Sequence, residues 1–175
     1  MSDLKGRRIA FLLTNGYEPS ELYSPWDAVI EQGAEAVLVS PESEEVSGGD
    51  HSQKVDLNVA EAKADDFDAL VLPGGTKNAD QLRMNQDAVN FTRAFFDSNK
   101  TVASICHAAW ILTEADVVKD RNMTSYPSLQ TDLRNAGANW SDEELVVDGN
   151  MITSRSPKDL PAFNEAIINK LSEEN

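Results

Sequence analysis

The sequence predicts an α/β protein built around a mostly parallel β-sheet that helices cover on both faces. Three observations predict it: short apolar runs of strand length recur along the chain, amphipathic helical patterns separate them, and turn residues end them. Continuous apolar strands are typical of parallel sheets that are buried on both faces. The 175 residues suit one domain, spanning 1–175, with a single core.

The expected elements follow one another in this alternating order. Strands are expected at 8–14, 34–40, 67–75 and 101–105, and helices at 20–33, 85–99, 107–118, 128–137 and 160–174. The polar segment 41–66 is a connection with room for a short hairpin. A second hairpin is expected near residue 150, turned by Asp148 and Gly149.

Composition excludes several classes of function. The net charge is −15, from 15 basic and 30 acidic residues, which argues against binding nucleic acid or an anionic membrane through a broad charged face. No apolar run approaches the roughly 20 residues of a membrane span, and no signal peptide precedes the first strand. A single cysteine excludes an internal disulfide. A cytoplasmic location is therefore expected.

Three polar segments follow predicted strands. They are "TNGYEPSE" after the first strand, "PGGTKNAD" after the third and "CHA" after the fourth. Because functional sites of open parallel sheets gather beyond the carboxyl ends of the strands, we expect these segments to converge.

The cysteine of the third segment, Cys106, is the only one in the chain and stands where a strand gives way to a helix. A sharp strand-to-helix turn can present a nucleophile, and a helix N-terminus favours a thiolate. A buried, inert thiol is the alternative. A Cys–His mechanism has only His107 or His51 to use, and His51 lies in a polar connection where exposure is expected.

Glu18 and the Pro-Gly-Gly turn are the other candidate groups. A protonated Glu18 would donate a hydrogen bond to the thiolate, and an ionised one would act as a base; capping of the next helix is the alternative. Backbone N–H groups of the turn at 73–75 either bind an oxyanion or simply reverse the chain. The sequence has no phosphate-binding loop and no zinc-ligand spacing, so neither a cofactor nor a metal is expected.

The motifs "NGYEPSEL", "DALVLPGG", "NADQLRMN" and "VASICHAAWIL", in this order, resemble the ThiJ/PfpI family and its PfpI-type intracellular branch. The resemblance implies a flavodoxin-like three-layer sandwich of the class I glutamine amidotransferase-like superfamily. A glutamine amidotransferase itself is excluded, because that enzyme needs a late histidine and none follows His107.

The resemblance also implies roles for individual residues. Cys106 matches the nucleophile, His107 the histidine beside it, and Glu18 the acid that hydrogen-bonds the cysteine. Gly75 and Ala108 match the positions whose backbone N–H groups form an oxyanion pocket. Asp80 matches an acid that reaches the histidine of a neighbouring subunit, which implies a homodimer or higher homo-oligomer with a shared active site.

The implied function is a stress-protective, cysteine-dependent hydrolase. Its substrates would be small glyoxal-type carbonyls or glycation adducts, as in a deglycase or glyoxalase, or peptides, as in an intracellular peptidase. The alternative is an oxidative-stress sensor or protective binding protein with an oxidisable, low-pKa cysteine. This chain reads "ICHAA" where relatives commonly read "ICHGP", so Ala108 and Ala109 change the start of the helix beside the pocket.

Overall fold

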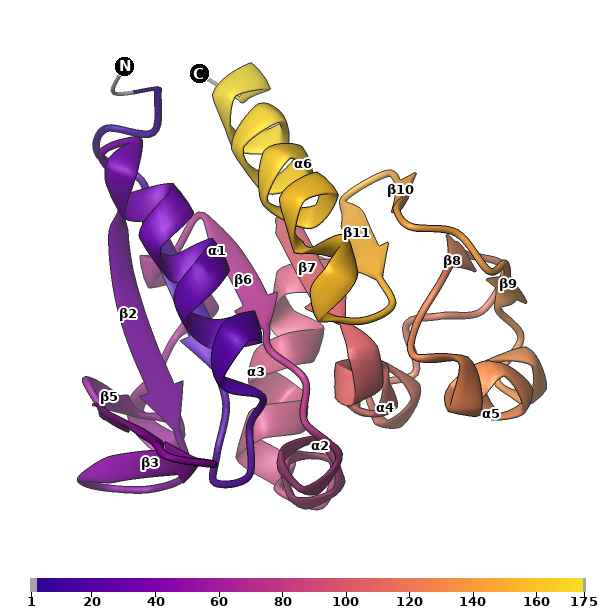
Figure 1. Cartoon of the computed structure of the whole chain (residues 1–175), viewed down its shortest axis with the longest axis horizontal. Helices are drawn as coiled ribbons and strands as arrows, with labels where there is room; N and C mark the ends of the chain where they lie inside the picture. Colours follow the sequence, from indigo (N-terminus) through magenta and orange to yellow (C-terminus); the bar gives the residue numbers. More distant parts are fainter. Residues whose placement is uncertain (1–2, 175) are drawn as a thin grey trace.

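A computed structural model describes residues 3–174 (Figure 1). Its central sheet has seven strands in the order β10-β11-β7-β6-β1-β2-β5, and only the β10–β11 pair is antiparallel. The strands are β1 (Arg8–Leu12), β2 (Glu35–Ser40), β5 (Leu57–Asn58), β6 (Ala69–Leu72), β7 (Thr101–Ile105), β10 (Val146–Asp148) and β11 (Met151–Ser154). The predicted fold class, a flavodoxin-like α/β sandwich with a mostly parallel sheet, is confirmed.

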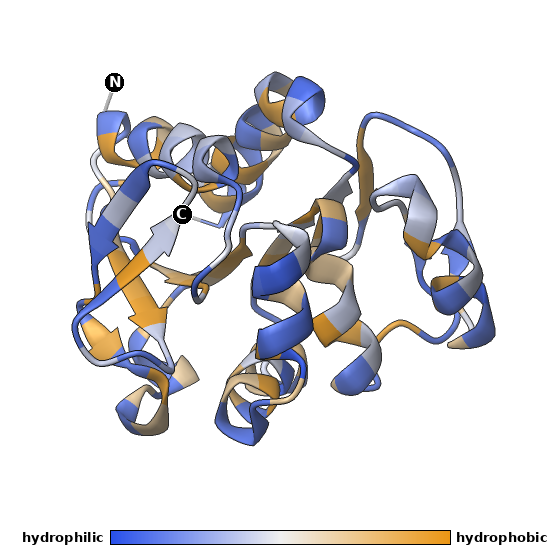
Figure 2. Cartoon of the chain, turned by 60° about the horizontal axis from the view of Figure 1, so that its bottom comes forward, coloured by the Kyte–Doolittle hydropathy of each residue, from blue (hydrophilic) through white to orange (hydrophobic). Residues whose placement is uncertain are grey.

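Helices cover both faces of this sheet, and each face has its own apolar core. Helices α1 (Pro19–Glu31) and α6 (Leu160–Glu173) lie on one face, and α3 (Gln86–Asp97) and α4 (Ala109–Glu114) lie on the other (Figure 1). Successive strand side chains alternate between the two cores, so Phe11 packs with the α1 side and Leu12 with the α3 side. Figure 2 shows apolar strands between helices with hydrophilic outer surfaces.

The remaining elements are short and lie around the edges of the sheet. They are the hairpin β3 (Glu45–Gly48) and β4 (His51–Lys54), the pair β8 (Asn122–Met123) and β9 (Asn139–Trp140), and helices α2 (Thr76–Leu82) and α5 (Gln130–Asn135). Single 3₁₀ turns occupy 59–61, 64–66, 106–108, 127–129 and 157–159. Within residues 3–174, every helix is too short or too polar to cross a membrane.

Most predicted elements are confirmed, and the differences lie in short elements. The helix expected at 107–118 is a 3₁₀ turn at Cys106–Ala108 followed by the shorter α4. The hairpin near residue 150 turns at Gly149 and Asn150, because Asp148 already pairs with Met151. Helix α2 was not predicted, since it has seven residues and no side chain caps its start.

Candidate active site

The three polar segments after β1, β6 and β7 converge, as predicted. The Glu18 backbone N–H donates to the Gly74 carbonyl at 3.1 Å, which joins the first segment to the second. Cys106 from the third segment lies beside both, in a cavity of about 280 Å³. The cavity is lined by Glu18, Glu21, Gly75, Thr76, Cys106, His107, Tyr126 and Pro157.

Cys106 occupies a sharp turn between β7 and the following helical segment. Its φ is 64°, in the left-handed region that residues with a side chain rarely adopt. This conformation holds the side chain at the end of the strand, as in other nucleophile elbows. The residue is only 8% exposed, and the backbone N–H groups of His107 and Gly75 hydrogen-bond its sulfur.

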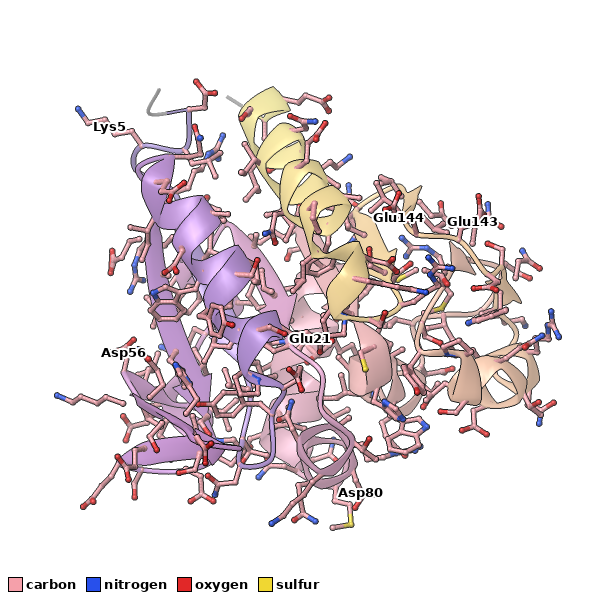
Figure 3. The ribbon with its side chains drawn as sticks, viewed as in Figure 1. Lys5, Glu21, Asp56, Asp80, Glu143 and Glu144 are labelled. Atoms are coloured by element: carbon pink, nitrogen blue, oxygen red, sulfur yellow. The ribbon has the colours of Figure 1, made fainter. Side chains whose placement is uncertain are left out.

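The carboxyl group in contact with the thiol belongs to Glu21, in the first turn of α1. Glu21 lies on the buried stripe of this helix with Leu22, Pro25 and Val29, and it is fully buried. Its Oε1 accepts a 2.8 Å hydrogen bond from the Gly74 N–H. Figure 3 shows Glu21 in the interior, where α1 begins beside the ends of the central strands.

Burial raises the pKa of Glu21 to about 8, so the carboxyl is mostly protonated at neutral pH. Its second oxygen, Oε2, is buried and has no hydrogen-bond partner within residues 3–174. A protonated carboxyl in this position has its O–H available for the sulfur of Cys106, the side chain that it contacts.

The sequence-based prediction gave this role to Glu18, and the structure places Glu18 elsewhere. Glu18 is half-buried at the rim of the cavity, where its Oε1 accepts a hydrogen bond from the Ser20 hydroxyl at 3.1 Å. Its charge raises the pKa of both Glu21 and Cys106 without a direct bond to either side chain. The polar segment was correct, but the residue that touches the thiol is one helical turn further along.

The pKa of Cys106 depends on this carboxyl. Burial and the negative charge of an ionised Glu21 raise the thiol pKa to about 12, and the N–H groups of His107 and Gly75 oppose the rise. Protonation of Glu21 removes its negative charge and supplies a further hydrogen-bond donor. Thiol and carboxyl therefore titrate as a coupled pair, in which the protonation state of Glu21 changes the pKa of Cys106.

His107 contacts both the Cys106 thiol and Ser128, a residue that the sequence analysis did not identify. Its Nδ1 is 3.3 Å from Cys106 Sγ, and its Nε2 is 3.3 Å from the Ser128 hydroxyl. The ring stacks on Tyr126 with centroids 4.6 Å apart. Burial lowers the pKa of His107, so the imidazole is neutral at neutral pH and can accept a proton.

Two glycines allow the carboxyl and the thiol to meet. A Cβ on Gly74 would collide with Glu21 Oε1 and lie 2.7 Å from Cys106 Cβ. Gly75 has a φ of 100°, and a Cβ there would lie 2.7 Å from the Glu18 backbone nitrogen. The Pro-Gly-Gly segment therefore does more than reverse the chain, because its shape and its N–H groups form one wall of the cavity.

The other sequence-based candidates lie apart from the thiol. Ala108 is buried in the core on the α3 side, and the N–H groups that bond the thiol belong to its neighbour His107 and to Gly75. Asp80 is exposed on the outside of α2 (Figure 3), so its contact with a histidine of another subunit stays a prediction. His51 is half-buried, and its Nδ1 is 2.6 Å from the Tyr17 hydroxyl.

Residues 3–174 contain no cluster of three or more histidine, cysteine, aspartate or glutamate side chains that could hold a metal ion. A larger cavity of about 340 Å³ lies between β10 and α6, and no cysteine or histidine lines it. The chemically equipped cavity is therefore the one around Cys106.

A cysteine at a strand-to-helix elbow, paired with a buried carboxyl on a parallel sheet, defines a cysteine-nucleophile α/β protein. More particularly, the chain belongs to the DJ-1/PfpI family, whose profile matches residues 7–170. Deglycase PfpI of Pyrococcus furiosus is 42% identical over 165 residues, which cover 94% of this chain and 99% of the relative. Protein/nucleic acid deglycase 2 of Escherichia coli is 40% identical over 169 residues, covering 94% and 98%.

Solved structures agree with this assignment. A two-domain protein from Anabaena variabilis, with DJ-1/ThiJ/PfpI-like and ferritin-like domains, superposes with a TM-score of 0.92 at 36% identity. The match covers 94% of this chain and 48% of that one. DJ-1beta of Drosophila melanogaster superposes with a TM-score of 0.89 at 27% identity, covering 95% and 90%.

Proposed function

We propose that this protein is a PfpI-type, cysteine-dependent hydrolase that acts on small glyoxal-type carbonyls and on the adducts they form with thiols and amines. The observation that carries the proposal is the convergence of the neutral Glu21 carboxyl and two backbone N–H groups on the Cys106 sulfur. The names of the relatives, several of which are deglycases, support the same chemistry.

Glu21 and the two N–H groups prepare the sulfur for addition. Neutral His107, whose Nδ1 is 3.3 Å from the sulfur, takes the thiol proton, and the stabilised thiolate attacks the aldehyde-level carbon of the substrate. A C–S bond forms, and the carbonyl electron pair becomes an oxyanion, which takes the proton back from His107 and leaves the imidazole neutral. Because the N–H groups of Gly75 and His107 already point to the sulfur, they are close to the atom where this negative charge develops.

His107 then moves the proton that completes the reaction. For a methylglyoxal unit, neutral His107 takes the proton from the carbon bonded to sulfur and returns it to the neighbouring carbon, which leaves a thioester. Water hydrolyses the thioester to a hydroxy acid and releases the thiolate. In an adduct, the hydroxyl on the same carbon first gives up its proton, its electron pair re-forms the carbonyl, and the carrier thiol or amine leaves with that proton; Cys106 then adds to the carbonyl as described. The net change is addition of one water without any external oxidant.

The cavity size favours small substrates over long peptides. The cavity around Cys106 holds about 280 Å³, and Tyr126 and Pro157 are among the residues that line it. A peptidase activity belongs to the same proposal only if an oligomer extends this cavity. A cytoplasmic location, suited to the removal of metabolic carbonyls, is a further part of the proposal.

The proposal includes a homodimer or higher homo-oligomer in which Asp80 of one copy reaches His107 of another. Asp80 is exposed on α2, and Met84, two residues beyond the end of this helix, is 73% exposed. An exposed methionine beside a carboxylate suits a surface that a second copy covers. Sedimentation velocity of the wild type and Asp80→Ala tests it, and a wild-type monomer with full activity would exclude a shared site.

Turnover of methylglyoxal, its N-acetylcysteine hemithioacetal and a fluorogenic peptide by the wild type and Cys106→Ser tests the main proposal. We expect Cys106→Ser to lose at least ~1,000-fold in kcat/KM on the two carbonyl substrates, because serine has no comparable thiolate. Equal rates for the two proteins would refute Cys106 as the nucleophile.

A redox role is the second candidate, because the same donors can hold an oxidised sulfur. A sulfinate on Cys106 would accept hydrogen bonds from protonated Glu21 and from the Gly75 and His107 N–H groups. Mass spectrometry after mild peroxide treatment tests it. Gain of two oxygens on Cys106 in the wild type, and only slow gain in Glu21→Gln, would support a sensor; no gain would exclude one.

A further inference from the structure

A second cavity, called the outer cavity here, adjoins the cavity around Cys106, which is the inner cavity. It has a volume of about 320 Å³ and is lined by Tyr126, Pro127, Asp142, Arg155, Ser156 and Lys158. Tyr126 lines both cavities, and Pro157 of the inner cavity lies between Ser156 and Lys158 of the outer one. A molecule that crosses the Tyr126 and Pro157 side chains would therefore occupy both.

The guanidinium of Arg155 forms a fixed polar wall of this outer cavity. Its Nε and Nη2 donate to the two carboxylate oxygens of Asp159 at 2.9 and 3.1 Å, and Asp159 is 1% exposed. Its Nη1 donates to Asp142 at 2.9 Å. A guanidinium has five N–H groups, so three bonds hold it in place and two N–H groups are left for a ligand.

The other charged groups of the outer cavity differ in how they are held. Lys158 is exposed and, within residues 3–174, has no ion-pair partner within 4.0 Å. Asp142 also pairs with Arg155, from the rim of the cavity, and 65% of its side chain is exposed. The cavity thus offers a free ammonium, two guanidinium N–H groups and the Ser156 hydroxyl, and it has one exposed carboxylate at its edge.

We propose that the outer cavity binds the carboxylate of the small molecule that carries the adduct, while the adduct itself enters the inner cavity and meets Cys106. This inference rests on the proposed function and names its substrate class: glyoxal-type adducts of amino acids and other small thiols or amines that bear a free carboxylate. A planar carboxylate suits the two N–H groups of Arg155, and Lys158 adds an opposite charge. Arg155 is already paired with two carboxylates, so Lys158 supplies the charge that gives this site, in a chain with a net charge of −15, its selectivity for an anion.

Two thiols that differ only in whether they bear a carboxylate would show how much the carboxylate contributes. We would compare methylglyoxal hemithioacetals of N-acetylcysteine and of N-acetylcysteine amide at equal concentrations of free methylglyoxal. The wild type should prefer the acid by about tenfold in kcat/KM, the factor expected for one charge-assisted contact. Turnover of methylglyoxal alone should be unchanged by Lys158→Gln and by Asp142→Asn, which lie outside the inner cavity.

Two substitutions should change this preference in opposite directions. Lys158→Gln removes the free cation and should lower the ratio to about twofold or less. Asp142→Asn removes the repelling carboxylate and releases Arg155 Nη1, so it should raise the ratio. Lys170→Gln, in the cavity between β10 and α6, is the matched control and should leave the ratio at the wild-type value.

A binding measurement makes the inference independent of turnover. Calorimetry on Cys106→Ser would use the stable thioethers S-acetonyl-N-acetylcysteine and its amide. We expect the acid to bind about tenfold more tightly, and Lys158→Gln to abolish the difference. Equal binding of the two, or a preference that Lys158→Gln leaves intact, would overturn the outer-cavity proposal. If the acid bound more tightly but Cys106 were not needed for turnover, the proposed function would be refuted and the carboxylate site would still be supported.

Discussion

The inner cavity around Cys106 and the outer cavity beside Arg155 meet at Tyr126, but their polar groups are held in opposite ways. In the inner cavity, burial keeps Glu21 neutral at physiological pH and glycines bring it against the thiol. In the outer cavity, Asp159 and Asp142 fix the position of the permanently charged Arg155 guanidinium with short ionic hydrogen bonds. One cavity controls the position of a proton, and the other fixes a charge.

This difference separates chemistry from recognition. The contact between a buried acid and a thiol is sensitive to small changes in shape, because Glu21 and Cys106 are both packed closely around Gly74. A guanidinium at a solvent-facing rim tolerates change, since water replaces part of any lost contact. Substitutions in the inner cavity should therefore cost more activity than substitutions in the outer one.

The largest effect is expected from Gly74→Ala. The added Cβ would collide with Glu21 Oε1 and crowd Cys106, so we expect at least a ~100-fold loss in kcat/KM and a destabilisation of about 1–3 kcal/mol. Steady-state kinetics and urea unfolding measure the two effects. The control is Gly6→Ala, where a Cβ meets nothing within 4 Å and only the positive φ is unfavourable. It should cost stability but no activity, and an active Gly74→Ala enzyme would contradict the close packing described.

Glu21→Gln should lower kcat/KM about 100-fold, because the amide cannot exchange the proton with the thiol. It should also flatten the pH dependence of stability. Folding raises the Glu21 pKa from 4.5 to about 8, so its contribution is full below pH 4.5 and is lost as the pH rises toward 8. That loss is about 3 kcal/mol by pH 7.

Urea unfolding of the wild type, Glu21→Gln and Glu18→Gln at pH 5 and pH 7.5 would measure this dependence. The wild type and Glu18→Gln should lose stability between the two values, and Glu21→Gln should not. If Glu18→Gln behaved like Glu21→Gln, the assignment of the buried acid would be wrong.

Asp159→Asn should have a moderate effect, confined to the outer cavity. Asp159 makes two of the three bonds that hold the Arg155 guanidinium, so the substitution would leave this group without a fixed position. We expect the preference for a carboxylate-bearing substrate to fall about threefold and the melting temperature to fall by a few degrees. Burial opposes ionisation of Asp159, but the bonds from Arg155 outweigh it and lower the Asp159 pKa. Its stabilisation is thus present above the unfolded value of 3.8 and disappears as the pH falls through the folded pKa. Thermal unfolding of the wild type and Asp159→Asn at pH 7 and pH 3 tests this pH dependence. The difference in melting temperature between the two proteins should shrink in acid, and a larger difference at pH 3 would contradict the prediction.

Among the groups around Cys106, the smallest effect is expected from Ser128→Ala, which removes the hydroxyl 3.3 Å from His107 Nε2. We expect a three- to fivefold lower kcat with little change in KM, because a neutral hydrogen bond contributes about 1 kcal/mol and the Tyr126 stack remains. The pH profile of kcat, compared with that of Asp80→Asn, identifies the partner of the imidazole. A larger loss in Asp80→Asn than in Ser128→Ala would assign that partner to a second copy of the chain.

The sequence predicted the regular part of this fold because strand-length apolar runs and helical periodicity are local properties. Its failures have physical reasons. Helix α2 follows a glycine with a positive φ and has no side-chain cap, so no local signal indicates its start. The contact between Ser128 and His107 joins residues 21 positions apart, and only the tertiary fold brings them together.

The choice between Glu18 and Glu21 shows where a stronger signal was available. Glu21 has the same helical spacing as the buried Pro25 and Val29, so a carboxyl on an apolar stripe was readable from the sequence. Glu18 precedes Pro19 and lies before the first turn, where a side chain faces the rim. A charged residue on the buried face of a helix is the better indicator of a functional acid.

The left-handed backbone at Cys106 has an evolutionary consequence. A cysteine in this conformation costs the fold on the order of 1–3 kcal/mol, and glycine would relieve that cost. Selection for stability alone therefore works against the nucleophile at this position. A lineage that no longer needs the reaction should drift to glycine or asparagine here, and the residue at the elbow then becomes a molecular record of whether the chemistry is still under selection.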